Sequence, residues 1–327
     1  MLAVGSGRLL RLTGALLLVA VLASPAGAQG FPDRPVHLIV PFAAGGPTDV
    51  FARVVAERVG ALFARQVVVE NRTGAGGNIA AELVIAAKPD GYTLLFSSAA
   101  IAIAPTLYRA LKYDPVKDLT PVALIGAVPL ILVVRPGVPA TLPALLAYLR
   151  ADPGKYSYGS AGSGTTTHLT VELFKTRAGV EVVHVPYRGS APAIQELLAG
   201  RFEFTIETLS AVKPFLASGQ LIPLGVTSAQ RSPLMATMPT VAELGLDGVI
   251  GSTWNMILAP AGTPQPIVER INATFRQAMA DPDAVARLTE LAIEPVADST
   301  PASATKFLVD EIARWAPIVK ASGATAE

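Results

Sequence analysis

Two hydrophobic periodicities alternate along the chain. Short runs of apolar and β-branched residues are each followed by a segment whose apolar residues recur every three or four positions. Runs of the first kind predict buried strands, and segments of the second kind predict helices with one buried face. In the first such unit, a strand over 36–42 precedes a helix from Thr48 that places Val55, Val59 and Leu62 on one face.

The same alternation continues to the C-terminus and predicts an α/β fold. Strand–helix–strand units of this length favour a parallel sheet covered by helices on both faces. Residues Ile267, Ile271, Phe275 and Met279 mark a long amphipathic helix, and a final helix covers 301–321. The other predicted strands are 66–71, 92–98, 129–137, 156–164, 181–187 and 202–207, and the other predicted helices are 77–88, 141–154, 166–178 and 191–200.

The length of the chain favours two lobes. At 327 residues, of which 51% are apolar, it has room for two domains of ordinary size. Crossovers between the lobes are expected near 126–130 and 251–256. We therefore expect one lobe over 29–127 plus 253–327 and a second over 128–252, with two crossover strands at the hinge.

The N-terminal segment has the pattern of a secretory signal peptide. Arg8 and Arg11 precede the apolar run LTGALLLVAVLAS, and AGA at 26–28 matches a small-residue cleavage motif. The apolar run is short for a membrane span, although an uncleaved anchor is the alternative. We expect residues 1–28 to be removed by cleavage near Ala28 and the mature protein to be soluble and exported.

Charge and composition exclude several functions. The chain has 26 basic and 25 acidic residues, which provide no electrostatic footprint for nucleic acid. It has no cysteine, so disulfides, thiolate catalysis and zinc–thiolate sites are excluded. No H-E-x-x-H motif, no histidine pair at ligand spacing and no calcium-binding loop occurs. We expect neither a metal nor a cofactor.

Small residues occupy the junctions between several strands and helices. The segments 42–49 (FAAGGPTD) and 160–168 (SAGSGTTTH) each lead into a helix, as do 72–78 and 187–192. Helix N-termini offer free backbone N–H groups and the positive end of the dipole, which together favour an anion. The glycine spacing matches neither the dinucleotide nor the P-loop pattern. These junctions therefore favour a carboxylate over a nucleotide.

Hydroxyl and carboxyl side chains at the junctions can also cap their own helices. Thr48 or Asp49 is expected to cap the first helix, and Thr165 or Thr166 the helix that follows 160–164. For Asp49 we expect capping to be the main role.

Catalysis is a second possibility at the same loop. Ser163 lies in a segment similar to a nucleophile elbow, but Ala161 stands where that motif has glycine. His168 lies on the first turn of a helix, where the dipole disfavours imidazolium, and no acidic orienting group is evident. His184 is better explained as a satisfied, partly buried strand residue, and His37 lies in the first strand. An exported hydrolase using Ser163 and His168 is the alternative to a binding protein, and a structural or adhesive exported protein is a further one.

A series of long motifs runs through the mature chain in a fixed order. They are RPVHLIVPFAAGGPTDVFARVVAERV, VVVENRTGAGGNIAAELVIAAKPDGYTLLFSS, YDPVKDLTPVALI, YGSAGSGTTTHLTVELFK, HVPYRGSAPAIQELLAGRFEF, MPTVAELG and ILAPAGTP. With them the chain resembles the Bug family, the solute-binding proteins of tripartite tricarboxylate transporters. The resemblance covers essentially all of the mature chain.

The resemblance implies a fold and a function. The fold is an α/β, two-lobed periplasmic binding protein of the Venus-flytrap type, in which each lobe is a sheet covered by helices. Such a protein is a periplasmic monomer without catalytic residues or cofactors. It captures a small carboxylate in the interlobe cleft and delivers it to membrane permease subunits.

The resemblance also implies the ligand-binding residues, which in the family often act through ordered waters. Glu207 stands where the family usually has aspartate, so the extra methylene is expected to shrink the cleft or shift ligand preference. Arg188 stands where lysine is common and keeps the charge. The expected ligand residues are Phe42, Ala44, Gly45, Gly46, Thr48, Asp49, Ser97, Ser98, Ser160, Gly162, Ser163, Thr165, Thr166, Tyr187, Gly189, Ser190 and Glu207.

Overall fold

The computed structural model describes residues 30–326. Within the described residues, the chain from Arg34 onward forms one compact unit. The Phe31–Pro32 peptide bond, which precedes it in the sequence, is cis. The predicted signal peptide, residues 1–28, lies outside the described residues. Among the residues that are described, no helix is both long enough and apolar enough to span a membrane.

The first half of the ten-stranded sheet is built around three parallel strands. β1 (Val36–Val40) lies between β2 (Val67–Asn71) and β3 (Thr93–Ser98) and pairs in parallel with both. β9 (Ser252–Pro260) then pairs antiparallel with β3, and β4 (Leu119–Val134) pairs antiparallel with β9. The prediction of a parallel sheet is therefore wrong at β4 and β9. These strands carry the chain out of the first lobe and back, so they need no parallel crossover unit.

β4 continues into the second half of the sheet. Its last residues pair antiparallel with β7 (Phe204–Thr208) and β8 (Ile222–Val226). β5 (Ser157–Ser160) pairs in parallel with β6 (Val183–Pro186) and with β7. The strand predicted at 129–137 is thus only the second part of a longer crossover strand.

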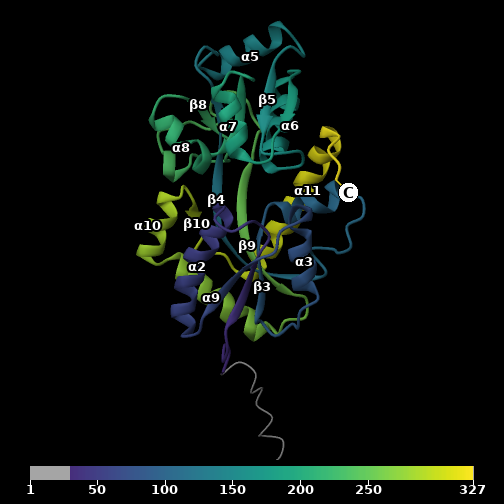
Figure 1. Cartoon of the computed structure of the whole chain (residues 1–327), viewed down its shortest axis with the longest axis vertical. Helices are drawn as coiled ribbons and strands as arrows, with labels where there is room; N and C mark the ends of the chain where they lie inside the picture. The colour runs from purple at the N-terminus through teal and green to yellow at the C-terminus, as the bar shows by residue number, and fades with distance from the viewer. Residues whose placement is uncertain (1–29, 327) are drawn as a thin grey trace, which may run out of the picture. The chain divides into compact units, whose positions relative to one another are not determined.

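Helices follow most strands and cover the sheet. Figure 1 shows β4 and β9 running between the part of the fold that carries α2, α3 and α9 and the part that carries α5 to α8. The first lobe has α2 (Pro47–Phe63), η1 (Ala75–Gly77), α3 (Asn78–Ile85), α4 (Ala100–Leu107), α9 (Gln265–Met279), α10 (Pro282–Glu290), the short strand β10 (Glu294–Pro295) and α11 (Pro301–Ser322). The second lobe has α5 (Leu142–Ala151), α6 (Thr166–Ala178), α7 (Ser190–Leu198), α8 (Leu209–Ala217) and η2 (Pro233–Met235).

The apolar faces of these elements form separate cores. In the second lobe, β7 turns Phe204 and Ile206 toward a core that includes Val171 and Phe174 of α6. The opposite face of the sheet packs against residues of α7 and α8. Leu169 of α6, by contrast, is buried in the core of the first lobe. The start of α6 therefore lies where the two lobes meet.

Candidate functional site

Six loops follow the carboxyl ends of parallel strands. In the first lobe the strands β1, β2 and β3 lead into α2, α3 and α4, and in the second β5, β6 and β7 lead into α6, α7 and α8. The carboxyl ends of parallel strands lie at one edge of a sheet, where α/β proteins bind ligands. The ligand residues expected from the sequence all lie at five of these junctions, those after β1, β3, β5, β6 and β7.

Asp49 holds the loop after β1 in place. Its side chain is buried, and its Oδ2 accepts hydrogen bonds from the Gly45 N–H (2.8 Å) and from Arg53 Nε (2.9 Å). Its Oδ1 accepts from Asn71 Nδ2 (2.8 Å). The Arg53 guanidinium, with these amides, lowers the pKa of Asp49 to about 2 despite its burial. Because both oxygens are engaged, Asp49 braces the loop backbone.

The N-cap of α2 is Gly46, so the prediction of Thr48 or Asp49 as its cap is wrong. Pro47 occupies the first helical position, which suits its fixed φ angle and its missing N–H. α2 therefore begins before Thr48, whose hydroxyl group had suggested the cap position. Asp49, in the first turn of α2, accepts a hydrogen bond from the backbone N–H of Gly45, which resembles the side-chain-to-backbone contact that the third helical residue makes in a capping box.

The serine pair at the end of β3 lies beside these glycine loops. Ser97 and Ser98 are buried and line a small cavity together with Pro41, Gly77 and Asn78. Ser98 Oγ accepts a hydrogen bond from the N–H of Ala100 at 3.3 Å, close to the start of α4. The structure thus brings the ends of β1 and β3 and the loop after β2 to one place.

The loop after β5 is braced by hydroxyl groups. Thr165 is the N-cap of α6, as predicted: its Oγ1 accepts from the His168 N–H (3.3 Å) and donates to the Gly162 carbonyl (2.6 Å). Ser160 Oγ accepts from the Gly162 N–H at 3.1 Å. Thr167 Oγ1 accepts from the N–H of residue 161 at 3.2 Å. Hydrogen bonds among its own residues and the first turn of α6 therefore hold most of this loop in place.

Three backbone N–H groups at the same loop have no protein acceptor. They belong to Ser163, which is exposed, and to Thr166 and Thr167 at the start of α6. Within residues 30–326 none of them donates a hydrogen bond. Unpaired donors at a helix N-terminus suit an anion.

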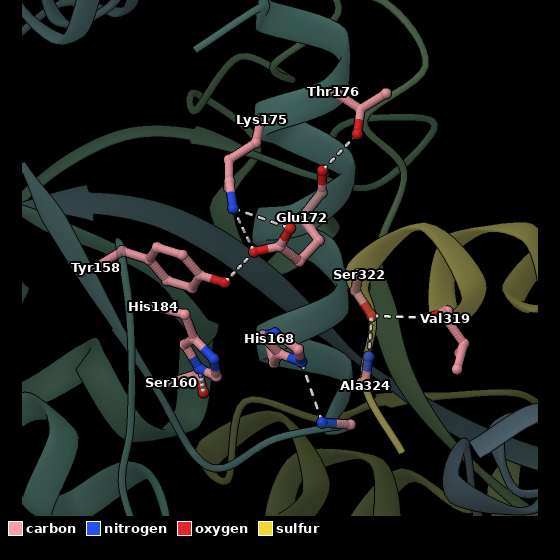
Figure 2. Close-up of polar contacts among 11 residues, drawn as sticks. Tyr158, Ser160, His168, Glu172, Lys175, Thr176, His184, Val319, Ser322 and Ala324 are labelled. Atoms are coloured by element: carbon pink, nitrogen blue, oxygen red, sulfur yellow. Dashed lines mark hydrogen bonds and ion pairs between the residues drawn. The ribbon is translucent and has the colours of Figure 1, made fainter. Parts of the chain in front are cut away.

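Two histidines lie directly beneath this loop. His168 Nδ1 accepts from the Gly164 N–H at 3.0 Å, and Ser160 Oγ lies 2.6 Å from His184 Nε2. The two imidazole rings stack with centroids 4.0 Å apart (Figure 2). Burial lowers the pKa of both rings, that of His184 to about 4.

The loop after β6 packs beside the loop after β5. The N–H of Tyr187 donates to the Ser160 carbonyl, and the N–H of Gly189 donates to the Ala161 carbonyl, both at 3.1 Å. Gly189 is the N-cap of α7 and has a φ of 118°, which favours glycine. Ser190 is the first residue of α7.

Glu207 lies next to the end of β7 and is fully buried. Its Oε2 accepts from the Thr208 N–H at 3.1 Å, whereas its Oε1 has no hydrogen-bond partner among the described residues. Burial raises the pKa of Glu207 to about 7, and the Ser190 hydroxyl and the Thr208 amide counter part of that rise. Near neutral pH this carboxyl can therefore be either a donor or an acceptor.

The two sets of expected ligand residues remain separate in this structure. Within the described chain, no hydrogen bond joins those after β1 and β3 to those after β5, β6 and β7. The loop after β5 does touch the first lobe, since a Cβ placed on Gly164 would lie 2.6 Å from Leu107 Cδ2. This contact joins α4 to the start of α6.

Two residues that organise the first loop were not expected from the sequence. Arg53 lies four positions after Asp49 on α2, a spacing at which ion pairs form, so a signal was present. Asn71 comes from β2, and its contact with Asp49 depends on strand pairing that no local pattern encodes. No group of three or more potential metal-ligating side chains was found in residues 30–326.

Comparison with known proteins identifies the family. Residues 51–324 match the model of the tripartite tricarboxylate transporter family receptor. The chain belongs to this receptor family. The receptor is 38% identical over 320 residues to the protein BugT of Bordetella pertussis strain Tohama I, a match that covers 97% of this chain and 98% of BugT.

Solved structures agree in fold. R. palustris Rpa4515 with adipate is 39% identical, with a TM-score of 0.79, over 90% of this chain and 99% of that one. The periplasmic binding protein BugD is 33% identical, with a TM-score of 0.76, over 91% of this chain and 100% of that one. The two-lobed α/β fold and the Bug-family resemblance predicted from the sequence are confirmed.

The family is one of substrate-binding receptors and is not enzymatic. The alternative of a hydrolase using Ser163 and His168 is therefore wrong, and the geometry explains why. His168 Nδ1 already accepts from the Gly164 N–H, and no hydrogen bond joins Ser163 to His168 within residues 30–326. The small-residue loop resembles a nucleophile elbow because both motifs need close backbone approach at a helix N-terminus.

Proposed function

We propose that this receptor captures a small dicarboxylate between its lobes and delivers it to the membrane permease subunits of a tripartite tricarboxylate transporter. It acts as an exported, periplasmic monomer after cleavage near Ala28. The proposed lobes are 29–127 plus 253–327 and 128–252. Support for this proposal comes from the adipate in Rpa4515 and from the loops of this chain.

The observation that carries the proposal is the set of unpaired N–H groups at Ser163, Thr166 and Thr167. A carboxylate that accepts two or three of them gains charge-assisted hydrogen bonds worth about 1.5 to 3 kcal/mol each. The helix dipole of α6 adds to this attraction. No side-chain cation is required, which fits a loop built from small residues.

A second carboxylate would be held from the first lobe. There the loop after β1 presents the N-terminus of α2, braced by Asp49, and the serines Ser97 and Ser98 lie at the end of β3. We propose that this loop contributes backbone groups of Ala44, Gly45 and Gly46, while Asp49 acts only on the loop. The other expected ligand residues stand as part of the same proposal.

Thermal-shift screening of the mature protein tests this function. The panel contains straight-chain diacids, tricarboxylates, acidic amino acids and aromatic carboxylates. A ligand present at a hundred times its Kd stabilises the folded state by about 2.7 kcal/mol, which is readily seen as a higher melting temperature. Mass spectrometry of the incubated ligand should show no turnover. A panel without any stabilising carboxylate, or a ligand consumed over hours, would contradict the proposal.

A further inference from the structure

The two stacked histidines contact the ligand loop through different routes. His168 accepts directly from the Gly164 N–H at 3.0 Å. His184 acts through Ser160, whose Oγ accepts from the Gly162 N–H (3.1 Å) and lies 2.6 Å from His184 Nε2. Figure 2 shows the two rings face to face beside the loop, His168 on α6 and His184 on β6.

The contact with the Gly164 N–H defines the tautomer of neutral His168. An imidazole nitrogen that accepts a hydrogen bond must be unprotonated. The Gly164 N–H can only donate, so neutral His168 carries its proton on Nε2. Ser160 Oγ accepts from the Gly162 N–H and shares a hydrogen bond with His184 Nε2. His168 therefore works as an acceptor, and a proton on its Nδ1 would remove the acceptor of the Gly164 N–H.

The surroundings of the pair keep both rings neutral. His168 is buried, His184 is half-buried, and Tyr158 of β5 stacks on His184 with centroids 4.9 Å apart. Glu172 of α6 favours protonation, but its carboxylate is held by Tyr158 Oη (2.5 Å) and by Lys175 Nζ (2.7 Å), and Lys175 disfavours protonation.

In the described part of the chain, Glu172 and Lys175 are the charged groups outside the pair that shift the pKa of the two rings. β7 presents apolar Phe204 and Ile206. α11 carries Arg314, which is paired with Glu311 and also donates to the Ile250 carbonyl. A second positive ring 4.0 Å away would add direct repulsion.

We propose that His168 and His184 are positioning residues of the ligand loop. Neutral His168 holds the N–H group of Gly164 directly, and His184 holds the N–H group of Gly162 through Ser160. Because the N–H groups of Gly164 and Gly162 are held by these contacts, the loop keeps a conformation in which the N–H groups of Ser163, Thr166 and Thr167 stay available for the carboxylate. The inference rests on the proposed function for the identity of this loop as a ligand loop.

Two variants of His168 separate its acceptor from its ring. His168→Phe keeps an aromatic ring to stack on His184 and removes the acceptor. His168→Asn removes the ring and keeps an oxygen at the position of Nδ1. Hydrogen exchange of the Gly164 amide, followed by NMR on the ligand-free protein, reports the contact directly.

We expect the Gly164 amide to exchange about tenfold faster or more in His168→Phe, since its acceptor is gone. In His168→Asn the rate should stay within about threefold of wild type. His37→Asn, on the distant strand β1, is the control and should change nothing. Equal exchange in wild type and His168→Phe would overturn the inference. If His168→Phe does not fold, nitrogen NMR of the wild-type imidazole decides, because a proton on His168 Nδ1 at pH 7 would also overturn it.

A pH profile distinguishes positioning from ordinary packing. Protection of the Gly164 amide should be unchanged as the pH falls through the usual histidine range near 6.5 and should be lost only at lower pH, because burial lowers the pKa of His168. Loss centred near pH 6.5 would contradict the neutral, buried pair.

Affinity for adipate provides the functional readout. It should fall about fivefold or more in His168→Phe and by less than about threefold in His168→Asn. Unchanged affinity in His168→Phe would contradict the role in binding. If wild type does not bind adipate, that result counts against the proposed ligand class alone, because the exchange measurement needs no ligand.

Discussion

At the scale of single residues, Glu207 is the place where burial and charge conflict most. Its carboxyl is fully buried, one oxygen has no partner among the described residues, and its pKa is raised to about 7 by burial. The unfolded group ionises near 4.5. The folded state therefore holds this proton more tightly, and the resulting stability is complete below about pH 4.5 and lost as the pH rises to about 7.

Replacing Glu207 with glutamine should remove this pH dependence. At pH 8 we expect Glu207→Gln to be more stable than wild type by up to about 3 kcal/mol, because no buried charge has to form. At pH 4.5 the two should agree within about 1 kcal/mol. Urea unfolding at both pH values measures the difference. Glu57→Gln, at an exposed ion pair, is the control and should shift stability by less than about 1 kcal/mol. If Glu207→Gln is destabilised relative to wild type by the same amount at pH 8 and at pH 4.5, the raised pKa assigned to Glu207 is contradicted.

At the scale of elements, the start of α6 depends on one hydroxyl. Thr165 caps the helix and also donates to Gly162, so it fixes both the helix and the loop. Thr165→Ala should cost about 1 to 2 kcal/mol of stability and also weaken carboxylate binding. Thr48→Ala is the matched control for stability: Thr48 lies at the start of α2 but caps nothing, so its loss should leave the melting temperature nearly unchanged. Thermal melts and calorimetric titrations of both variants make the comparison. If Thr165→Ala and Thr48→Ala lose the same stability, the loss in Thr165→Ala does not come from the missing helix cap.

Most elements could be predicted from hydrophobic period alone, and the misses have physical causes. α6 spans 166–178, as predicted, and α9 includes the four apolar residues that marked it in the sequence. α4 was missed because its sequence, AIAIAPTL, is apolar on all sides and has no amphipathic signal. The start of β4 was missed because Pro121 and Pro129 lie within it, and proline usually argues against a strand interior.

The candidate site, too, was predicted from the sequence only in part. Glycine-rich junctions marked the loops that we propose bind the ligand, because the backbone conformation at these positions is determined by the local sequence. The contacts that brace the loops could not be predicted. Asn71 reaches Asp49 through the pairing of β1 and β2, and His184 reaches His168 through the packing of β6 against α6. Both depend on tertiary placement.

At the scale of the whole molecule, Gly164 is where the loop after β5 meets α4. It has a φ of +75°, and a Cβ there would lie 2.6 Å from Leu107 Cδ2. Gly164→Ala should therefore cost both backbone strain and a clash, together about 2 to 4 kcal/mol. Gly179→Ala, also at positive φ but facing open space, should cost only the strain, about 1 kcal/mol. Denaturant unfolding gives both values.

A compensating change tests whether the lobes really touch at this point. Leu107→Ala should recover part of the loss caused by Gly164→Ala, because it removes the methyl groups in the way. Additive losses in the double variant would mean that the contact between α4 and the loop is not formed in solution.

We propose that backbone N–H groups at the lobe edges bind a small dicarboxylate as an anion. Calorimetric titration of the mature protein with succinate, glutarate and adipate, each paired with its dimethyl ester, tests this proposal. The ester keeps the carbon skeleton and removes both charges. At least one diacid should bind one to one with micromolar or tighter affinity, and its ester should not bind. A receptor that binds none of the diacids, or that binds an ester as tightly as its acid, would contradict it.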